Sequence, residues 1–526
     1  MDHSRRDFLK GAASVGAVAA TGLALNMYSS PAQSASAAPV EDEQKWDLEA
    51  DLVVVGLGAA GASCAYHASK EDPGASIIIL EKQAEGHHPS TEMSGGGVMY
   101  TKDADKATNY MTLCAGVTVP GDVTRAWATE ALGIKDLFYE LGYDFEIIDS
   151  LTVGEQSTFE DADSVGMFTL PGDRGGAFLL WELLLGSVQQ ENINIMYETP
   201  GNRLITKALG ENKHEVIGIE AIQNGKPLFI KANKGVVLTC GGFEFNDKLK
   251  HFLPAYPIYF YDNPANTGDG VIMAQEIGAQ LWHMNKMLGR GIGFYDDSGL
   301  GDLGFIMMLN PPPYVMLDKY GKRFLNEELQ ASLDHAVYYS LIQYDAHKGE
   351  YPRIPSWWIF DSNRLATPLT STTFGAAGVG MYDWSEDNSK ELAAGWILKG
   401  ETLEELAQVT GLDFASLQET MAAYNAACDS GIDEFGRSAE TLIKMTPPYY
   451  ATRLWAGGPN TSGGPERNAK AQVLDVRGEP IPRLFSAGEL GQAVGDLYPI
   501  GGGDICEAIC FGAIAAREAL SLAPWE

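Results

Sequence analysis

The sequence predicts an α/β fold built on a parallel sheet, with a glycine-rich turn joining its first strand to its first helix. Residues 51–55 (DLVVV) form a short β-branched apolar run, which is typical of a buried parallel strand. The turn follows directly at residues 56–61 (GLGAAG), and a helix-compatible segment begins at Ala62. A second apolar strand is predicted at residues 76–80, directly before Glu81.

The turn has the spacing of a dinucleotide-binding site. Gly56 permits the tight turn, Gly58 lets a pyrophosphate approach the backbone, and Gly61 lets the helix pack closely on the strand. The N-terminus of the helix then directs its positive dipole end at the phosphates. Glu81, 20 residues after Gly61, can accept both ribose hydroxyls, and its charge argues against a 2′-phosphate. The residues expected to bind the dinucleotide here are Gly56, Gly58, Ala59, Ala60, Gly61 and Glu81.

Composition narrows the classes of partner. The chain has 526 residues, enough for two domains. Its 70 acidic and 37 basic residues give a net charge of −33, and so negative a field repels phosphate backbones, so we expect no nucleic-acid partner. The six cysteines form neither a C-x-x-C-H motif nor a disulfide framework. We therefore expect no attached haem and no metal site, and we expect Cys506 and Cys510 to pack in the core.

The N-terminal residues predict an export signal. Residues 4–10 (SRRDFLK) resemble the twin-arginine signature. The apolar stretch that follows, residues 11–25, is too short and too weakly apolar for a stable membrane span, and residues 35–37 (ASA) offer a small-residue cleavage site. We therefore predict a twin-arginine (Tat) signal peptide over residues 1–38 and export to the periplasm or the extracytoplasmic face of the membrane.

Six further motifs follow the glycine-rich turn in a fixed order. They are residues 94–97 (SGGG), 235–243 (GVVLTCGGF), 266–270 (NTGDG), 321–327 (GKRFLNE), 424–425 with 433–437 (YN and DEFGR), and 484–489 (LFSAGE). In this order the seven motifs resemble the FAD-dependent oxidoreductase 2 family, which includes soluble fumarate reductase flavoproteins and 3-ketosteroid dehydrogenases. The resemblance runs from about Ala50 to Glu518.

The resemblance implies FAD as the cofactor. It also implies a glutathione-reductase-like, FAD-binding Rossmann domain that is interrupted by an α+β cap domain for the substrate. The implied boundaries are residues 48–290 for the first part of the FAD-binding domain, 291–447 for the cap and 448–526 for the second part. The further FAD-binding residues that it implies are Lys82, Ser94, Gly95, Gly96, Gly242, Asp269, Glu489, Asp504 and Ile505.

Residues 496–505 (DLYPIGGGDI) bear on the substrate. Fumarate reductases have an arginine at the position of Pro499, where its planar guanidinium clamps a substrate carboxylate. This segment instead resembles the Y-P-x-P-G stretch of 3-ketosteroid dehydrogenases, in which a tyrosine hydroxyl and a glycine N–H bind the substrate ketone. The resemblance thus implies that Tyr498 and the N–H of Gly502 bind a carbonyl oxygen and stabilise developing enolate charge. Fumarate is accordingly not the expected substrate.

The sequence differs from both fumarate reductases and 3-ketosteroid dehydrogenases at the position of the proton-transferring residue. They place a proton-transferring residue five positions after the asparagine of the GKRFxNE motif, and counting from Asn326 gives Ala331, which cannot transfer a proton. Arg364 lies near the acid arginine of the fumarate reductases, and Tyr314 precedes the GKRF motif. Both are candidates for the catalytic proton donor, and a structural or surface role is the alternative for Arg364.

The sequence favours an enzyme that transfers hydride between flavin N5 and a C=C or CH–CH bond conjugated to a carbonyl group. The expected substrate is a small molecule, an apolar carbonyl compound. Reduction is favoured because the catalytic tyrosine of the dehydrogenases is missing. One alternative is a reductase of an unsaturated carboxylate, with Arg290 or Arg364 as the carboxylate-binding residue; another is a non-catalytic flavin electron-transfer protein. Since no haem or Fe–S motif is present, we expect a separate exported redox partner such as a cytochrome.

Overall fold

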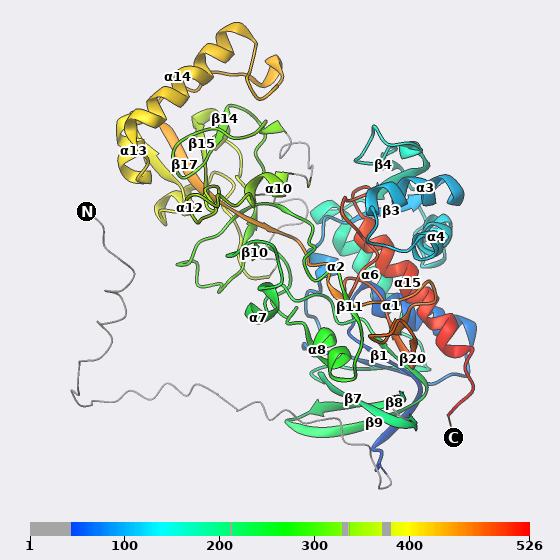
Figure 1. Cartoon of the computed structure of the whole chain (residues 1–526). Coiled ribbons are helices and arrows are strands. Elements are labelled where there is room, and N and C mark those ends of the chain that lie inside the picture. Colours follow the sequence, from blue (N-terminus) through cyan, green and yellow to red (C-terminus); the bar gives the residue numbers. More distant parts are fainter. Residues whose placement is uncertain (1–43, 211–212, 329–334, 336, 371–379, 526) are drawn as a thin grey trace, which may run out of the picture. The chain divides into compact units, whose positions relative to one another are not determined.

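The computed structural model describes residues 44–210, 213–328, 335, 337–370 and 380–525 (Figure 1). The predicted signal peptide and Ala331 lie outside the described residues. Among the helices of these residues, none is both long and apolar enough to span a membrane.

Within the part of the chain that the structure describes, the largest sheet has eight strands and is parallel at its centre. β1 (Leu48–Val55) pairs in parallel with β2 (Ile77–Leu80) and with β9 (Lys226–Leu238), and β9 pairs in parallel with β20 (Pro480–Ser486). Both strands predicted around the glycine-rich turn are therefore confirmed. The other strands of this sheet are β6 (Ile193–Met196), β7 (Gly201–Gly210), β8 (Lys213–Gln223) and β19 (Gln472–Leu474).

Both faces of β1 are buried. Leu52 and Val54 belong to the hydrophobic core on one face, and Val53 and Val55 belong to the core on the other. Because successive side chains of a strand point to opposite faces, a strand that is covered on both sides must be apolar at every position. This is why the run over residues 51–55 shows no alternation.

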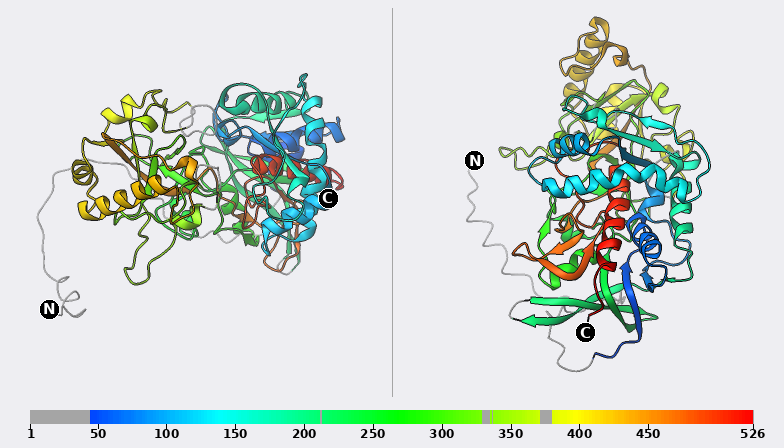
Figure 2. Two further views of the ribbon diagram at one scale, coloured as in Figure 1. Left: turned by 90° about the horizontal axis from the view of Figure 1, so that it is seen from above. Right: turned by 90° about the vertical axis from the view of Figure 1, so that its right-hand side faces the viewer.

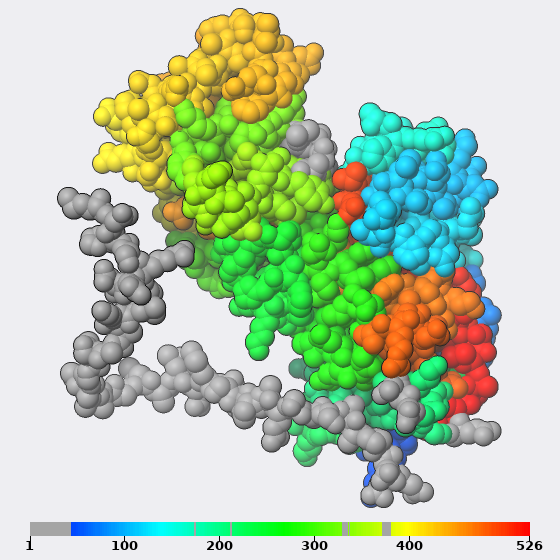
Figure 3. All heavy atoms as spheres, in the orientation of Figure 1, coloured from blue at the N-terminus to red at the C-terminus, as the bar shows by residue number. Residues whose placement is uncertain are grey.

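Two helices that are far apart in the sequence lie side by side against this sheet (Figures 1 and 2). α1 (Ala59–Glu71) packs on α15 (Gly503–Leu520), and Ser63 Oγ donates a hydrogen bond to Ile509 O at 2.7 Å. The surface in Figure 3 shows the cyan segment around residues 100–170 next to the red C-terminal segment. α2 (Ser90–Met93) precedes this segment. Its elements are β3 (Gly97–Thr101), α3 (Ala104–Ala115), α4 (Gly121–Glu130), α5 (Ile134–Glu140), β4 (Asp149–Leu151) and β5 (Val165–Thr169), and α6 (Ala177–Ser187) follows it.

A second, mainly antiparallel sheet has seven strands, with β17 (Tyr449–Gly458) at its centre. Its other strands are β10 (Tyr259–Phe260), β12 (Arg290–Gly293), β13 (Phe305–Ile306), β14 (Tyr314–Leu317), β15 (Ser356–Asp361) and β16 (Leu398–Gly400). The helices of this part are α10 (Val337–Leu341), α11 (Ser362–Leu365), α12 (Ser389–Ala393), α13 (Leu403–Thr410) and α14 (Phe414–Ser430). The α/β class with a second, α+β part is thus confirmed, while the domain boundaries stay predictions. The boundary proposed before residue 448 precedes β17, which pairs with this second sheet.

The parallel strands bring four loops to one edge of the first sheet. The chain leaves the carboxyl ends of β1, β2, β9 and β20 at this edge, where ligands of open parallel sheets bind. The loop after β1 contains the glycine-rich turn, and its geometry depends on close packing. A Cβ placed on Gly61 would lie 2.0 Å from the carbonyl oxygen of Gly56, far inside van der Waals contact.

We expect the substitution Gly61→Ala to lower the free energy of unfolding by about 1–3 kcal/mol, because the added methyl group must push α1 away from the end of β1. The shift of the urea midpoint measures the effect. Gly133→Ala is the control, since Gly133 has a negative φ of −89° and a Cβ there would meet no atom within 4 Å. Equal midpoints for the two variants would contradict the expected contact.

Candidate active site

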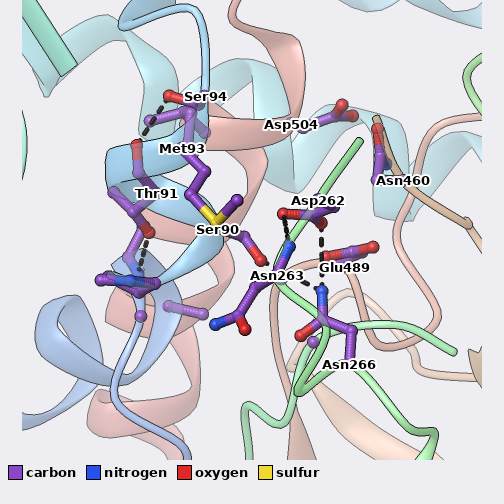
Figure 4. Close-up of a pocket in the computed structure, with 18 of the residues that line it drawn as sticks. Ser90, Thr91, Met93, Ser94, Asp262, Asn263, Asn266, Asn460, Glu489 and Asp504 are labelled. Carbon is purple, nitrogen blue, oxygen red and sulfur yellow. Dashed lines mark hydrogen bonds between the residues drawn. The ribbon is translucent and has the colours of Figure 1, made fainter. Parts of the chain in front are cut away.

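The loops at the edge of the first sheet surround a cavity of about 460 Å³, which falls in the size range of cofactor and small-molecule sites. Residues from the second sheet close its opposite wall, including Arg290 on β12 and Ile306 on β13. Figure 4 shows part of this cavity, with Ser90, Asp262 and Glu489 among the side chains that line it.

The glycine-rich turn is held in place by two side chains from other segments. The carboxylate of Glu81, at the end of β2, is buried and accepts hydrogen bonds from the N–H of Leu57 at 2.9 Å and of Gln83 at 2.8 Å. The hydroxyl of Thr91 accepts the N–H of Ala59 at 2.9 Å. These bonds fix the start of α1, so that its N-terminus and the open side of the turn face the cavity.

Two residues predicted to bind the cofactor, Lys82 and Asp269, form an ion pair. Lys82 Nζ lies 2.7 Å from Asp269 Oδ2 and 3.0 Å from the hydroxyl of Thr267, at the start of α8 (Asp269–Glu276). Ser94 Oγ donates to Thr91 O at 2.7 Å and accepts the N–H of Gly96 at 3.1 Å. Asn266 of the NTGDG motif donates to Ser90 Oγ at 3.0 Å, four residues before the SGGG motif, so two segments that are far apart in the sequence meet at the cavity wall.

Most residues predicted to bind the cofactor line this cavity, and their roles stay predictions. Those on the wall are Gly56, Gly58, Ala59, Ala60, Glu81, Lys82, Ser94, Gly95, Asp269, Glu489, Asp504 and Ile505. Gly61, Gly96 and Gly242 are not among the lining residues; the first two let neighbouring backbone approach, and Gly242 lets side chains approach. A Cβ on Gly242, for example, would lie 2.5 Å from Glu489 Oε1.

Three buried carboxyl groups gather beside the wall. Oxygen atoms of Glu244, Asp262 and Glu489 lie within 4.8 Å of one another. Burial, and then the neighbouring Glu244, raises the pKa of Asp262 to about 8 and that of Glu489 well above its usual value. Figure 4 shows Asn266 beside Asp262, where its amide donates to Asp262 Oδ2 at 3.0 Å. Such like-charged acids in a dry site favour shared protons over full ionisation.

The predicted carbonyl-binding pair lies where α15 begins. The hydroxyl of Tyr498 accepts the N–H of Asp504 at 3.1 Å, and both Tyr498 and Gly502 line the cavity. Burial raises the pKa of Tyr498 well above its usual value, so the hydroxyl keeps its proton and remains a donor. Burial, and then Glu507, raises the pKa of Asp504 to about 7.

His335 lies against Tyr498 and was not predicted as a site residue. The two rings are 5.0 Å apart at their centroids, and His335 lines the cavity. Its Nδ1 lies 3.1 Å from Glu155 Oε2, on a segment 180 residues earlier. A histidine paired with a carboxylate is a common device for moving protons near neutral pH. No motif in the sequence marks His335, and its place follows from tertiary packing alone.

The two predicted proton donors are not among the residues that line the cavity. Arg364 is fully buried and donates to backbone oxygens, including Leu309 O at 2.7 Å and Pro368 O at 3.1 Å. Tyr314 is also fully buried, its hydroxyl donates to Asn310 Oδ1 at 3.3 Å, and burial raises its pKa to about 12. The geometry gives these two roles no support, and they stay predictions.

Several polar residues of the wall had no prediction attached. They are Gln83, Ser90, Thr91, Asp262, Asn263, Asn266, Asn460 and His335. Thr91 and Asp262 lie within a few residues of the SGGG and NTGDG motifs, so proximity to a motif could have indicated them.

Two family models match this chain, one for FAD binding and one for export. The FAD binding domain model matches residues 51–505, and the model of the twin-arginine translocation signal matches residues 2–22. The predicted Tat signal is thereby confirmed, and with it export of the protein.

Two known relatives are similar to this chain over most of their own length. Digoxin reductase of Eggerthella lenta is 25% identical over 99% of this chain and 98% of its own. The 4-oxocyclohexanecarboxylate 2-dehydrogenase of Sinomonas cyclohexanicum is 25% identical over 89% of this chain and 92% of its own. The structure of 3-ketosteroid delta1-dehydrogenase from Sterolibacterium denitrificans aligns with a TM-score of 0.76 and 22% identity, covering 90% of this chain and 100% of that chain.

The residues present fit FAD. The turn at the N-terminus of α1 leaves its cavity side open, since a Cβ on Gly58 would meet only Thr91 Oγ1, at 3.5 Å. The carboxylate of Glu81 lines the cavity at the end of β2, where a ribose would be bound. Buried oxygens of Glu489 and Asp504 have no partner among the described residues and can accept bonds from a ligand.

The raised pKa of Asp262 predicts a pH dependence of stability. Between its usual pKa of 3.8 and about 8, the folded chain holds a proton that the unfolded chain has released, so the free energy of unfolding falls as the pH rises through this range. Asp262→Asn removes the titration, and we expect this variant to lose less stability than the parent between pH 5 and pH 9, by about 4 kcal/mol.

Urea midpoints of the exported form at several pH values measure this difference. The exposed Asp144→Asn controls for the loss of one acidic side chain. A parent and an Asp262→Asn variant with parallel pH profiles would show that Asp262 ionises normally.

Proposed function

The chain belongs to the FAD binding domain family, and we propose on this premise that it is an FAD-dependent oxidoreductase acting on a carbon–carbon bond next to a carbonyl group. The names of its relatives refer to digoxin, to a ketosteroid and to an oxocyclohexanecarboxylate, and the latter two are ketones. When bound, the flavin supplies or accepts the hydride. What this chain contributes is the binding of the substrate, the stabilisation of charge and the movement of a proton.

The observation that carries the proposal is the pair of donors at the start of α15. Tyr498 keeps its hydroxyl proton, and the N–H of Gly502 forms no hydrogen bond with any residue that the structure describes. Two neutral donors aimed at one carbonyl oxygen stabilise the enolate charge that develops when the conjugated carbon gains a hydride. The N-terminus of α15, a helix of 18 residues, adds a favourable dipole at the same point.

His335 and Glu155 support a proton route beside this pair. In the direction of reduction, a proton passes from the imidazolium of His335 to the α-carbon of the substrate, the N–H bond breaks, and the new C–H bond takes up the electron pair of the enolate. The α-carbon is bonded directly to the carbonyl carbon. When Tyr498 binds the carbonyl oxygen, a proton donor beside Tyr498 therefore lies near the α-carbon. Glu155 stabilises the protonated ring through Nδ1.

Reduction is the direction we propose, with electrons from a separate exported redox partner such as a cytochrome. Support for the partner is indirect. The Tat signal places the protein outside the cytoplasm, away from soluble nicotinamide cofactors, and the net charge of −33 suits a basic partner surface.

The substitution Tyr498→Phe tests the carbonyl site. We expect turnover of cyclic enones, measured with reduced viologen as the electron source, to fall about 100-fold or more while flavin content is unchanged, because one of two donors to the developing enolate is lost. Tyr424→Phe is the control, since its hydroxyl donates to Ile443 O at 2.9 Å away from the cavity. Unchanged turnover in Tyr498→Phe would remove the basis of the proposal.

Replacing His335 tests the proton route separately. His335→Gln should lower turnover about 100-fold, the lower end of what a general acid contributes, and Glu155→Gln should lower it less. The pH profile of the parent should lose its histidine limb in His335→Gln, and thermal stability with bound flavin should not change. A profile that keeps this limb in the variant would assign the proton to another group.

A further inference from the structure

Arg290 is a buried cation on the cavity wall that pairs with no residue among those the structure describes. Its residue is 6% exposed, and it begins β12 opposite Gly457 of β17. Its Nε atom has no hydrogen-bond partner, and no hydrogen bond or ion pair joins its guanidinium to any residue that the structure describes. A guanidinium carries five donors and is always charged, so a buried one requires acceptors.

Other arginines that are as deeply buried have such acceptors. Arg467 pairs with Glu507 and donates to Leu490 O at 3.1 Å. Arg437 donates to Tyr314 O at 2.6 Å, and the donors of Arg364 are taken up by backbone oxygens. These three side chains form part of the fold. Arg290 differs from them in facing the cavity, so its acceptor is expected to come from a ligand.

The position of Arg290 favours the substrate over the cofactor. Most residues predicted to bind FAD come from segments that follow strands of the first sheet or from the start of α15, whereas Arg290 belongs to the second sheet. Leu288, two residues before it, lines the main cavity and also a small side cavity beside Tyr498 and His335. Tyr261, which lines the same cavity, interacts electrostatically with both Arg290 and Asp504, so Arg290 lies toward the start of α15, where the proposed carbonyl site is.

The charge of Arg290 is not cancelled by the acids nearby. No described carboxylate forms an ion pair with it. Asp262 and Asp504 line the same cavity, and burial raises their pKa values to about 8 and about 7, so both carboxyls hold protons for part of the time at neutral pH. The cavity thus offers an unpaired positive charge to a ligand.

We propose that Arg290 binds a carboxylate of the substrate. The substrate then carries two groups: a conjugated carbonyl, bound by Tyr498 and Gly502, and a carboxylate, bound by the guanidinium through charge-assisted hydrogen bonds. This inference rests on the proposed function and narrows its substrate class from carbonyl compounds in general to anionic ones.

A pair of unreactive probes tests the inference on the flavin-loaded protein. 4-Hydroxybenzoate and 4-hydroxybenzamide share a phenol oxygen for the carbonyl site and differ in one negative charge. Dissociation constants are read from the change in the visible absorbance of the flavin, with no turnover. We expect the parent to bind the benzoate about tenfold or more tightly than the amide, as one charge-assisted pair allows.

Four variants separate the possible outcomes. Arg290→Gln should abolish the preference for the benzoate and leave the affinity for the amide within about twofold of the parent. Arg290→Lys should keep part of the preference. Arg453→Gln, which changes an exposed residue of β17, should keep the whole preference. Tyr498→Phe should weaken both probes alike, which reports on the carbonyl site independently. A parent without preference for the benzoate, an Arg290→Gln variant that retains it, or loss of flavin from Arg290→Gln alone would each overturn the inference.

Discussion

The tight packing at the junction of β1 and α1 is the constraint on which the rest of the site depends. Gly61 leaves no space for a side chain beside Gly56 O, and on the other side of α1 a Cβ at Gly512 of α15 would lie 2.5 Å from Ala60 O. Since α15 begins with the loop that carries Tyr498 and Gly502, this one contact sets the spacing between the dinucleotide turn and the carbonyl-binding loop. Any movement of α1 would therefore be passed on to both ends of the cavity.

Local features of the sequence were enough to predict the first sheet and one wall of the site. β1, the turn, β2 and Glu81 follow one another within 34 residues, and each has a pattern that sterics or hydrogen bonding requires (48–81). The opposite wall could not be predicted in this way. His335 meets Glu155 across 180 residues, and Asp262 meets Glu489 through the contact of two sheets, so neither pair leaves a local pattern.

Arg290 and Arg364 also show what the sequence alone could not predict. Arg290 and Arg364 were equal candidates from the sequence, because residue type does not reveal which donors are already used. In the fold, Arg364 donates hydrogen bonds to backbone oxygens, including those of Leu309 and Pro368. Arg290 instead lines the cavity, where its donors are available to a ligand. The satisfaction of buried polar groups, rather than their identity, distinguishes a structural arginine from one available to a ligand.

The pairing of α1 with α15 has a consequence for the order of events in the cell. Ser63 and Ile509, which are hydrogen-bonded, are separated by 446 residues, so the core around the glycine-rich turn is a contact of very high sequence separation. Such contacts close late in folding. The dinucleotide half-site made by residues 51–81 thus stays incomplete during most of synthesis, and the coloured holoprotein can form only after nearly the whole polypeptide has left the ribosome. With a twin-arginine signal at the N-terminus, we expect cofactor insertion to follow release from the ribosome and to precede export.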